Sequence, residues 1–329
     1  MRVVRKTVAV ILFVLIGGLL FSAMQEVFVD KSSYPHYRAW KAGEDINVLV
    51  LGNSHADNGI RAGDLSLGLT ESTGRDIRVF NYAVYGMRME QMYYFVREIF
   101  NNHVPELVIL ETYAFCPLAD GDREILARRA FDVLPFNRNK VEAVNYCVLE
   151  ERESFYLPFL TYHSRWESLT PYDFMVLYDS SLWPRYGSNG TYTGEIMEDP
   201  GDGWFQQAIP VPGELREITP SEKECLEKLL LLLEEKQVTL LFASVPFKSQ
   251  MGLNSIEQIK INNYLRENYV NGSTVQMLDM NRLWGELDFD YDDLYNAGHV
   301  NGSGANKVTA CLLEYLGEFL LPADPIGQE

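Results

Sequence analysis

Short apolar runs alternate with amphipathic segments along the chain from about residue 46. Five runs are short, uninterrupted and rich in aliphatic residues, as buried parallel strands are: 47–52, 77–81, 107–110, 238–243 and 275–278. Apolar residues spaced three and four apart predict helices over 87–101, 219–236, 255–269 and 305–321. The alternation predicts an α/β fold, with a doubly wound, mostly parallel five-stranded sheet covered by helices on both faces.

A long stretch after the third predicted strand lacks this rhythm. It contains two helical stretches, 122–129 and 140–150, and a loop rich in Gly, Asp, Pro and Tyr over 186–203. We interpret residues 114–218 as a helical and loop insertion on the sheet, within a single domain that covers 46–325.

The N-terminal segment is apolar on every face. Residues 7–25 carry no charge, which gives 19 residues between Lys6 and Glu26. At 1.5 Å per residue this run spans roughly 28 Å, about the hydrocarbon thickness of a lipid bilayer. Cations precede the run and acids follow it, so we expect the body of the protein to lie outside the cytoplasm. A cleaved signal peptide and a retained anchor both fit. The length and the lack of an Ala-x-Ala site favour an anchor over 1–27, followed by a juxtamembrane linker over 28–45.

Composition excludes several classes of protein. The chain has 329 residues, 47% of them hydrophobic, so it can bury a large core and is not intrinsically disordered. Its formal charge of 28 − 46 = −18 argues against binding nucleic acid. Four cysteines without a Cys-x-x-Cys pair form neither a disulfide framework nor a zinc motif, and we prefer free thiols: Cys116, Cys147, Cys225 and Cys311. No metal or organic cofactor is implied.

Candidate chemistry lies where strands end, because ligands of such sheets bind beyond the carboxyl ends of the strands. The first strand ends in Gly52-Asn53-Ser54, and a serine at a strand-to-helix turn is exposed as a nucleophile. Alone, the motif is more typical of a tight turn with a helix-capping serine. However, His299 lies on the loop after the fifth strand, which should bring it beside Ser54 as a general base.

This pairing resembles the SGNH hydrolase superfamily, also called GDSL-like esterases. Gly52-Asn-Ser54-His is similar to its first motif block, in which Ser is the nucleophile. Asn81-Tyr-Ala-Val-Tyr-Gly86 resembles the second block, whose Gly donates a backbone N–H to the oxyanion, as does the nucleophile's own N–H. Asn296-Ala-Gly-His299 stands where the family has Asp-x-x-His, the acid and base of its triad.

A central segment, Tyr162-His163-Ser-Arg165-Trp166, resembles a membrane-anchored branch of this superfamily. Proteins of that branch work in cell-surface polysaccharide O-acetylation and D-alanylation, often beside membrane-bound O-acyltransferases. The resemblance implies that His163 faces the cleft and that Arg165 binds a carboxylate or phosphate of the substrate. Alternatively, Trp166 packs the insertion while Arg165 pairs with an acidic side chain.

Two departures from the family pattern leave alternatives open. Asn296 replaces the triad Asp, so Asn296, Asp293 or Asp292 supports His299, or a Ser–His dyad works without an acid.

The second departure concerns the oxyanion hole. The third block's Gly-x-Asn-Asp is absent, because the chain reads Glu111-Thr-Tyr-Ala after the third strand. The missing donor would then be supplied by Tyr113, Asn53 or Thr112.

Two functional hypotheses follow. The first is a membrane-anchored, extracytoplasmic serine esterase or O-acyltransferase that acts on ester-linked acyl groups, with a cell-surface glycan as the expected substrate. The second is a non-catalytic subunit of the same fold, which docks on a membrane-bound O-acyltransferase through the anchor and the stretch Phe28–Lys41.

Overall fold

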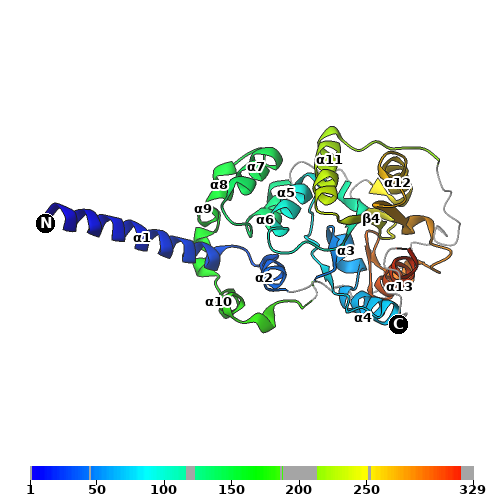
Figure 1. The fold of residues 1–329 in the computed structure, drawn as a ribbon, viewed down its shortest axis with the longest axis horizontal. Coiled ribbons are helices and arrows are strands. Elements are labelled where there is room, and N and C mark those ends of the chain that lie inside the picture. Colours follow the sequence, from blue (N-terminus) through cyan, green and yellow to red (C-terminus); the bar gives the residue numbers. More distant parts are fainter. Residues whose placement is uncertain are drawn as a thin grey trace, which may run out of the picture.

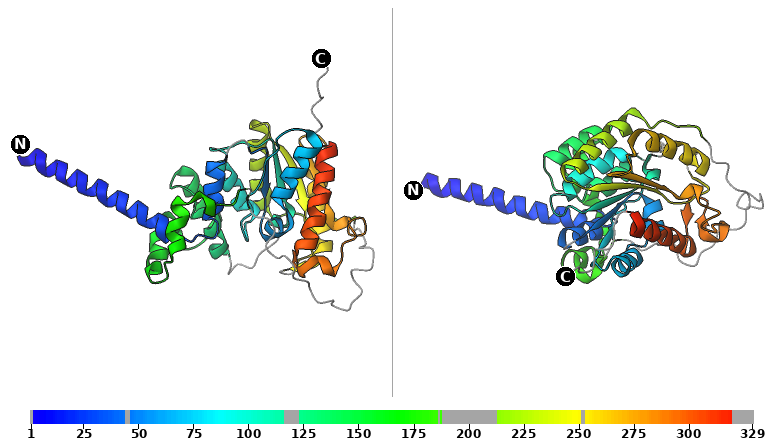
Figure 2. Two further views of the ribbon diagram at one scale, coloured as in Figure 1. Left: turned by 90° about the horizontal axis from the view of Figure 1, so that it is seen from below. Right: turned by 45° about the vertical axis from the view of Figure 1, so that its right-hand side comes forward.

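The computed structural model describes residues 2–43, 46–115, 123–185, 187, 213–250 and 253–319. Its main sheet has five parallel strands in the order β2-β1-β3-β4-β7 (Figures 1 and 2), which confirms the predicted fold class. The strands are β1 (Val48–Leu51), β2 (Val79–Asn81), β3 (Leu107–Glu111), β4 (Thr239–Ser244) and β7 (Val275–Asp279). Nearly every strand residue is buried, because helices cover both faces of the sheet.

Alternate strand residues point into two separate cores. Leu49 and Leu51 contribute to one core, and Val48 and Val50 to the other. On the first face lie α2 (Tyr34–Ala42), α5 (Met89–Ile99), α11 (Pro220–Glu235) and α12 (Ser255–Tyr269). On the second face lie α3 (Ser54–Gly59), α4 (Ala62–Thr73) and α13 (Gly302–Phe319).

The predicted insertion is helical where the structure describes it. Its elements lie between β3 and α11: α6 (Arg123–Phe131), α7 (Arg138–Cys147), α8 (Arg152–Tyr156), α9 (Pro158–Tyr162), η3 (His163–Glu167), α10 (Pro171–Tyr178) and η4 (Ser180–Leu182). Helices α8 to α10 gather at the end of the body from which the N-terminal helix emerges (Figure 1). Most of the predicted loop over 186–203 lies outside the described residues. Cys147, Cys225 and Cys311 are free thiols, and Cys116 lies outside the described residues.

Helix α1 (Arg2–Phe28) projects from the body (Figure 1), and its side chains over residues 4–20 are exposed. The segment Val4–Phe28 is long and apolar enough to span a membrane, a criterion that a signal sequence also meets. Part of the expected linker belongs to the folded body, because it forms α2. Trp40 in this helix is fully buried, and its Nε1–H donates to Ile99 O at 3.0 Å.

Short elements at the carboxyl ends of the strands hold the loop that carries His299. The antiparallel pair β8 (Leu294–Asn296) and β9 (His299–Val300) joins η7 (Tyr291–Asp293) to α13. Beside it lies the pair β5 (Ser249–Gln250) and β6 (Leu253–Asn254). The N–H groups of Lys248 and Ser249 both donate to Ala297 O, at 2.8 and 2.9 Å, so the two hairpins support each other. The remaining short elements are η1 (Thr112–Phe115) and η6 (Met280–Arg282).

Glu111 ends β3 directly beneath this edge and is completely buried. Its Oε1 accepts a hydrogen bond from the Tyr113 N–H at 3.0 Å, whereas its Oε2 has no partner among the described residues. Burial disfavours the carboxylate and raises the pKa of Glu111 to about 8. The carboxyl group is therefore predominantly neutral at pH 7.

We predict that Glu111→Gln makes the stability of the protein less dependent on pH. Wild-type Glu111 stays protonated in the folded chain up to about pH 8, whereas the unfolded chain loses this proton near pH 4.5. The protonated Glu111 therefore contributes its full stabilisation below pH 4.5. As pH rises from 4.5 to 8, the free energy of unfolding falls by up to about 1.4 kcal/mol per pH unit. Denaturant unfolding of both proteins in detergent between pH 5 and 8 measures the difference. Parallel stability curves would contradict a neutral Glu111.

Candidate active site

Ser54 is the first residue of α3, directly beyond the end of β1. Only glycine fits at position 52, since a Cβ there would lie 2.5 Å from the Ala56 Cβ and 2.9 Å from the Glu111 Cβ. This close approach lets the chain turn sharply from strand into helix. Asn53 caps the new helix, because its Oδ1 accepts the His55 N–H at 3.1 Å. The turn places the Ser54 hydroxyl at the edge of the sheet where ligands bind.

His299 lies beside Ser54 although 245 positions separate them in the sequence. Its Nε2 is 2.8 Å from the Ser54 Oγ, and its Nδ1 is 3.1 Å from the Asn296 Oδ1. An amide oxygen can only accept, so Nδ1 carries the proton and Nε2 presents a lone pair to the serine hydroxyl. The same Asn296 oxygen accepts the backbone N–H groups of Gly298 and His299, both at 2.9 Å. The arrangement is that of a nucleophile, a general base and a group that orients the base.

The imidazole of His299 is buried and neutral. Only 9% of its surface is exposed, and burial lowers its pKa to about 4. A second imidazole, that of His55, lies 5.1 Å away between ring centroids, and burial lowers its pKa well below the ordinary value. Neither ring therefore carries a proton on both nitrogens at neutral pH, and His299 is ready to accept one.

The loop after β2 brings Gly86 to the same pocket. It continues alongside β1, because the N–H groups of Tyr82 and Val84 donate to Val50 O and Gly52 O at 2.8 and 3.0 Å. Gly86 has a φ of +74°, and a Cβ on it would lie 2.5 Å from the side chain of Leu126, so this position requires glycine. Ser54, Gly86 and His299 all line one pocket of about 200 Å³.

The three side chains predicted as candidates to complete the oxyanion hole differ in availability. Asn53 lines the pocket, and its Oδ1 is fixed by the His55 N–H. The Tyr113 hydroxyl donates to Gln250 O at 3.2 Å, and its ring stacks on His55 with centroids 3.8 Å apart. The hydroxyl of Thr112 accepts a hydrogen bond from Gln258. Asn53 is therefore the side chain best placed to donate a third hydrogen bond.

The structure does not bring Asp293 to His299. Asp293 is 1% exposed and accepts hydrogen bonds from the Ser303 hydroxyl and the Lys307 ammonium, each at 2.7 Å. These contacts tie η7 to α13 and leave Asn296 as the partner of His299. Across the described ranges, no group of three or more His, Cys, Asp or Glu side chains could hold a metal ion.

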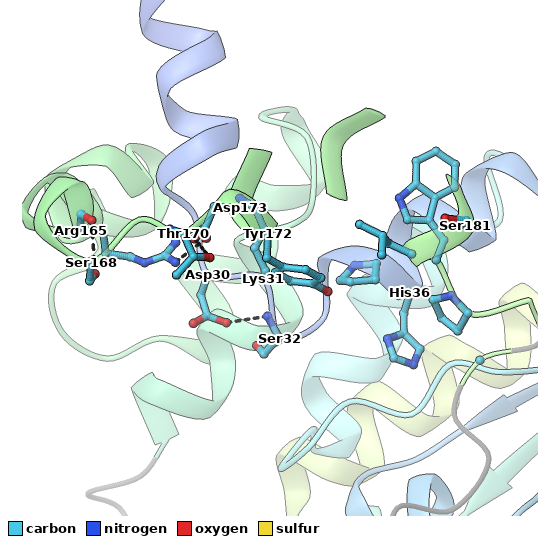
Figure 3. A pocket seen from close by; sticks show the side chains of 15 residues that line it. Asp30, Lys31, Ser32, His36, Arg165, Ser168, Thr170, Tyr172, Asp173 and Ser181 are labelled. Atoms are coloured by element: carbon cyan, nitrogen blue, oxygen red, sulfur yellow. Dashed lines mark hydrogen bonds and ion pairs between the residues drawn. The ribbon is translucent and has the colours of Figure 1, made fainter. Parts of the chain in front are cut away.

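His163 and Arg165 lie outside the pocket that contains Ser54. The Arg165 guanidinium donates to Phe28 O at 2.6 Å and pairs with Asp173 at 2.6 Å. It lines a separate cavity of about 900 Å³ beside the end of α1 (Figure 3). His163 is exposed, and its Nδ1 lies 2.8 Å from Leu160 O. The segment that contains both residues therefore contacts the N-terminal helix rather than Ser54.

The pocket is also lined by residues that the sequence-based prediction did not assign to the site, among them Gln250, Leu126 and Arg129. The Gln250 Oε1 accepts a hydrogen bond from the His55 Nε2–H at 2.8 Å. Gln250 follows β4, and the rule that ligands bind beyond the carboxyl ends of strands already indicates this position. Leu126 and Arg129 come from α6 of the insertion and close the pocket opposite the sheet. No local pattern marks these two, because only the fold of the insertion brings α6 over Ser54.

A third cavity, of about 440 Å³, lies between the other two. It shares Tyr85 and Arg129 with the pocket that contains Ser54, and it shares Ser32 and His36 with the cavity beside α1. The three cavities therefore adjoin one another in a series that leads from the end of α1 to Ser54.

Comparisons with known proteins do not assign a family to this chain. No protein-family model and no curated protein matches the sequence. Among solved structures, the chain is similar to an acetyl xylan esterase from the rumen bacterium Butyrivibrio proteoclasticus, with a TM-score of 0.31 and 10% sequence identity. The match covers 84% of this chain and 64% of that chain, so it spans less than two thirds of the esterase. A similarity of this size carries no information about the reaction, so the reaction has to be inferred from the geometry of the site.

We predict that the full chain in detergent shows a His299 imidazole that titrates near pH 4 and stays neutral from pH 5 to 8. Asn296→Asp should raise this pKa toward neutrality, because a carboxylate beside Nδ1 stabilises the imidazolium. NMR titration measures both values, with His299→Gln to assign the signal. A wild-type pKa near 6.5 would contradict the buried, uncharged site.

Proposed function

We propose that this protein is a serine ester hydrolase or O-acyltransferase of SGNH type. The observation that carries the proposal is the chain of hydrogen bonds Ser54 Oγ to His299 Nε2 at 2.8 Å, and His299 Nδ1 to Asn296 Oδ1 at 3.1 Å. A serine in contact with a neutral, oriented imidazole is the arrangement that activates a hydroxyl for attack on a carbonyl carbon.

The first half-reaction forms an acyl-enzyme. The Ser54 Oγ attacks the ester carbonyl while its proton passes to the His299 Nε2. The carbonyl oxygen becomes an oxyanion, which accepts hydrogen bonds from the backbone N–H groups of Ser54 and Gly86 and from the Asn53 amide. The tetrahedral intermediate then collapses, the bond to the alcohol oxygen breaks, and His299 returns the proton to the leaving alcohol.

The second half-reaction releases the acyl group. An incoming hydroxyl gives its proton to His299 and attacks the acyl carbon, and Ser54 leaves with that proton. Water as the acceptor makes the protein an esterase, whereas a sugar hydroxyl makes it an O-acyltransferase. The small pocket at Ser54 favours a short acyl group, and the adjoining hollows beyond Arg129 favour an extended acceptor such as a glycan.

The location that fits this function is the outer surface of a membrane. Helix α1 is long and apolar enough to serve as an anchor, and the cations that precede the apolar run favour an extracytoplasmic body. A membrane-bound O-acyltransferase is the partner that the motif resemblance suggests as a source of acyl groups.

Covalent labelling tests the nucleophile and the base. Full-length protein in detergent should react with a fluorophosphonate probe, and Ser54→Ala should abolish the adduct. His299→Ala should slow labelling by about 10²–10⁴-fold, because the hydroxyl loses its base. Intact-protein mass spectrometry over time measures both effects.

Ser72→Ala serves as the matched control, since Ser72 lies on α4 outside the pocket and its loss should leave labelling unchanged. A folded wild type that never labels would overturn the enzymatic proposal. That outcome would favour the alternative of a non-catalytic subunit.

We also predict a preference for short acyl chains. The pocket volume of about 200 Å³ holds acetyl and similar groups, whereas longer chains meet Leu126. Leu126→Ala should raise turnover of octanoyl relative to acetyl aryl esters at least several-fold, because a half-buried side chain that lines the pocket is shortened. A ratio unchanged between wild type and variant would show that Leu126 does not limit the acyl group.

A further inference from the structure

Helix α1 is fastened to the body at a fixed orientation. The Phe159 ring on α9 packs edge-on against Phe21 and Phe28, with centroids 5.5 and 5.7 Å apart. The Arg165 guanidinium on η3 binds the carbonyl oxygens of Phe28 and Val29, at 2.6 and 2.8 Å. A cation at the carbonyl end of a helix also stabilises the helix dipole. The anchor and the insertion therefore form one packed unit.

The Lys31 ammonium binds the same helix end from the other side. It donates to the carbonyl oxygens of Glu26, Val27 and Val29, and it lies over the Tyr34 ring at 4.9 Å. Two basic side chains, Arg165 and Lys31, thus donate hydrogen bonds to the free carbonyl groups in the last turn of α1. These bonds fix the direction of α1 relative to the body.

The packing fixes the level at which a bilayer would meet the insertion. Gln25 ends the uncharged run of α1, and Phe21 lies four residues earlier, about 6 Å deeper at 1.5 Å per residue. Phe28 lies about 4.5 Å further out by the same rise. Phe159 contacts both, so α9 lies across the boundary between hydrocarbon and headgroups, a zone roughly 5–8 Å thick on each side of a bilayer.

The side chains exposed on α9, η3 and α10 suit this boundary. Seven large apolar residues lie 43–86% exposed around the end of α1: Leu157, Leu160, Trp166, Tyr172, Phe174, Met175 and Tyr178. Helix α10 is apolar on both sides: Val176 and Leu177 pack into the core beside the buried Asp173, whereas Phe174, Met175 and Tyr178 point outward. A surface helix of a soluble protein has a polar outward face, whereas an outward apolar face with Trp and Tyr is typical of helices at a membrane interface.

We propose that this surface, formed by α9, η3 and α10, lies in the outer interface of the bilayer spanned by α1. The occupant is lipid rather than a protein because the surface is continuous with the membrane-spanning helix and lies at the depth that α1 dictates. Figures 1 and 2 show these helices at the end of the body from which α1 emerges. The proposal rests on α1 as a retained membrane anchor and is independent of the ester chemistry.

Fluorescence quenching tests the depth of Trp166. The full chain is reconstituted alone in phosphatidylcholine bilayers, either plain or brominated near the top of the acyl chains. The Trp166 signal is the difference between wild type and Trp166→Phe. It should fall by roughly half or more in the brominated bilayers, since bromine quenches only indoles at its own depth.

Two further variants in the Trp166→Phe background separate the outcomes. Phe13→Trp, at the centre of α1, should be quenched by lipid brominated deep in its chains, and Leu231→Trp, exposed on α11, should not be quenched at all. A quenched Phe13→Trp with an unquenched Trp166 would overturn the interface proposal while the anchor stands, and would assign the surface to a protein partner. An unquenched Phe13→Trp would overturn the anchor and the interface together. Equal quenching of Leu231→Trp would show non-specific adsorption and would likewise reject the proposal.

Discussion

One side-chain oxygen, the Asn296 Oδ1, sets the geometry on which the candidate site depends. It accepts three N–H groups, two from the turn between β8 and β9 and one from the His299 ring. The backbone bonds fix the turn, and the ring bond fixes the tautomer, so one atom determines both where the imidazole lies and which nitrogen faces Ser54. The turn is further held by the Lys248 and Ser249 N–H groups, which donate to Ala297 O.

The site does its work without a formal negative charge beside the histidine. His299 is buried, its partner is a neutral amide, and Glu111 at the end of β3 is predominantly neutral at pH 7. A dry, uncharged pocket strengthens the hydrogen bonds that an oxyanion would receive. The same surroundings stabilise the imidazolium poorly, which is why burial lowers the pKa of His299. The carboxylate of Asp293 is kept away from the ring by its ion pair with Lys307 on α13.

The end of α1 shows how the chain uses its few basic residues. In a protein with a net charge of −18, Arg165 and Lys31 are both placed on the last carbonyl groups of the N-terminal helix. Since α1 and the insertion are packed together, the distance from the anchor to Ser54 is a property of the fold. The cavity beside α1 and the cavity that adjoins it lie between the anchor and Ser54.

Much of the fold and the centre of the site could be read from the sequence. The five apolar runs predict buried strands because a parallel sheet covered on both faces admits only apolar residues, and each run becomes a strand. The carboxyl-end rule then places Ser54 and His299 together, since parallel strands deliver their following loops to one edge.

Other assignments depend on contacts that no local pattern records. Asn296 and Asp293 lie three and six residues before His299, and only the β8–β9 turn and Lys307 decide which of them meets the ring. Arg165 reaches Phe28 across 137 positions, so its role depends on how the insertion folds back onto α1. Sequence determines which segments are strands and which residues end them, because periodicity and burial are local. Tertiary structure alone decides which polar side chains meet, because their partners come from distant elements brought together by packing.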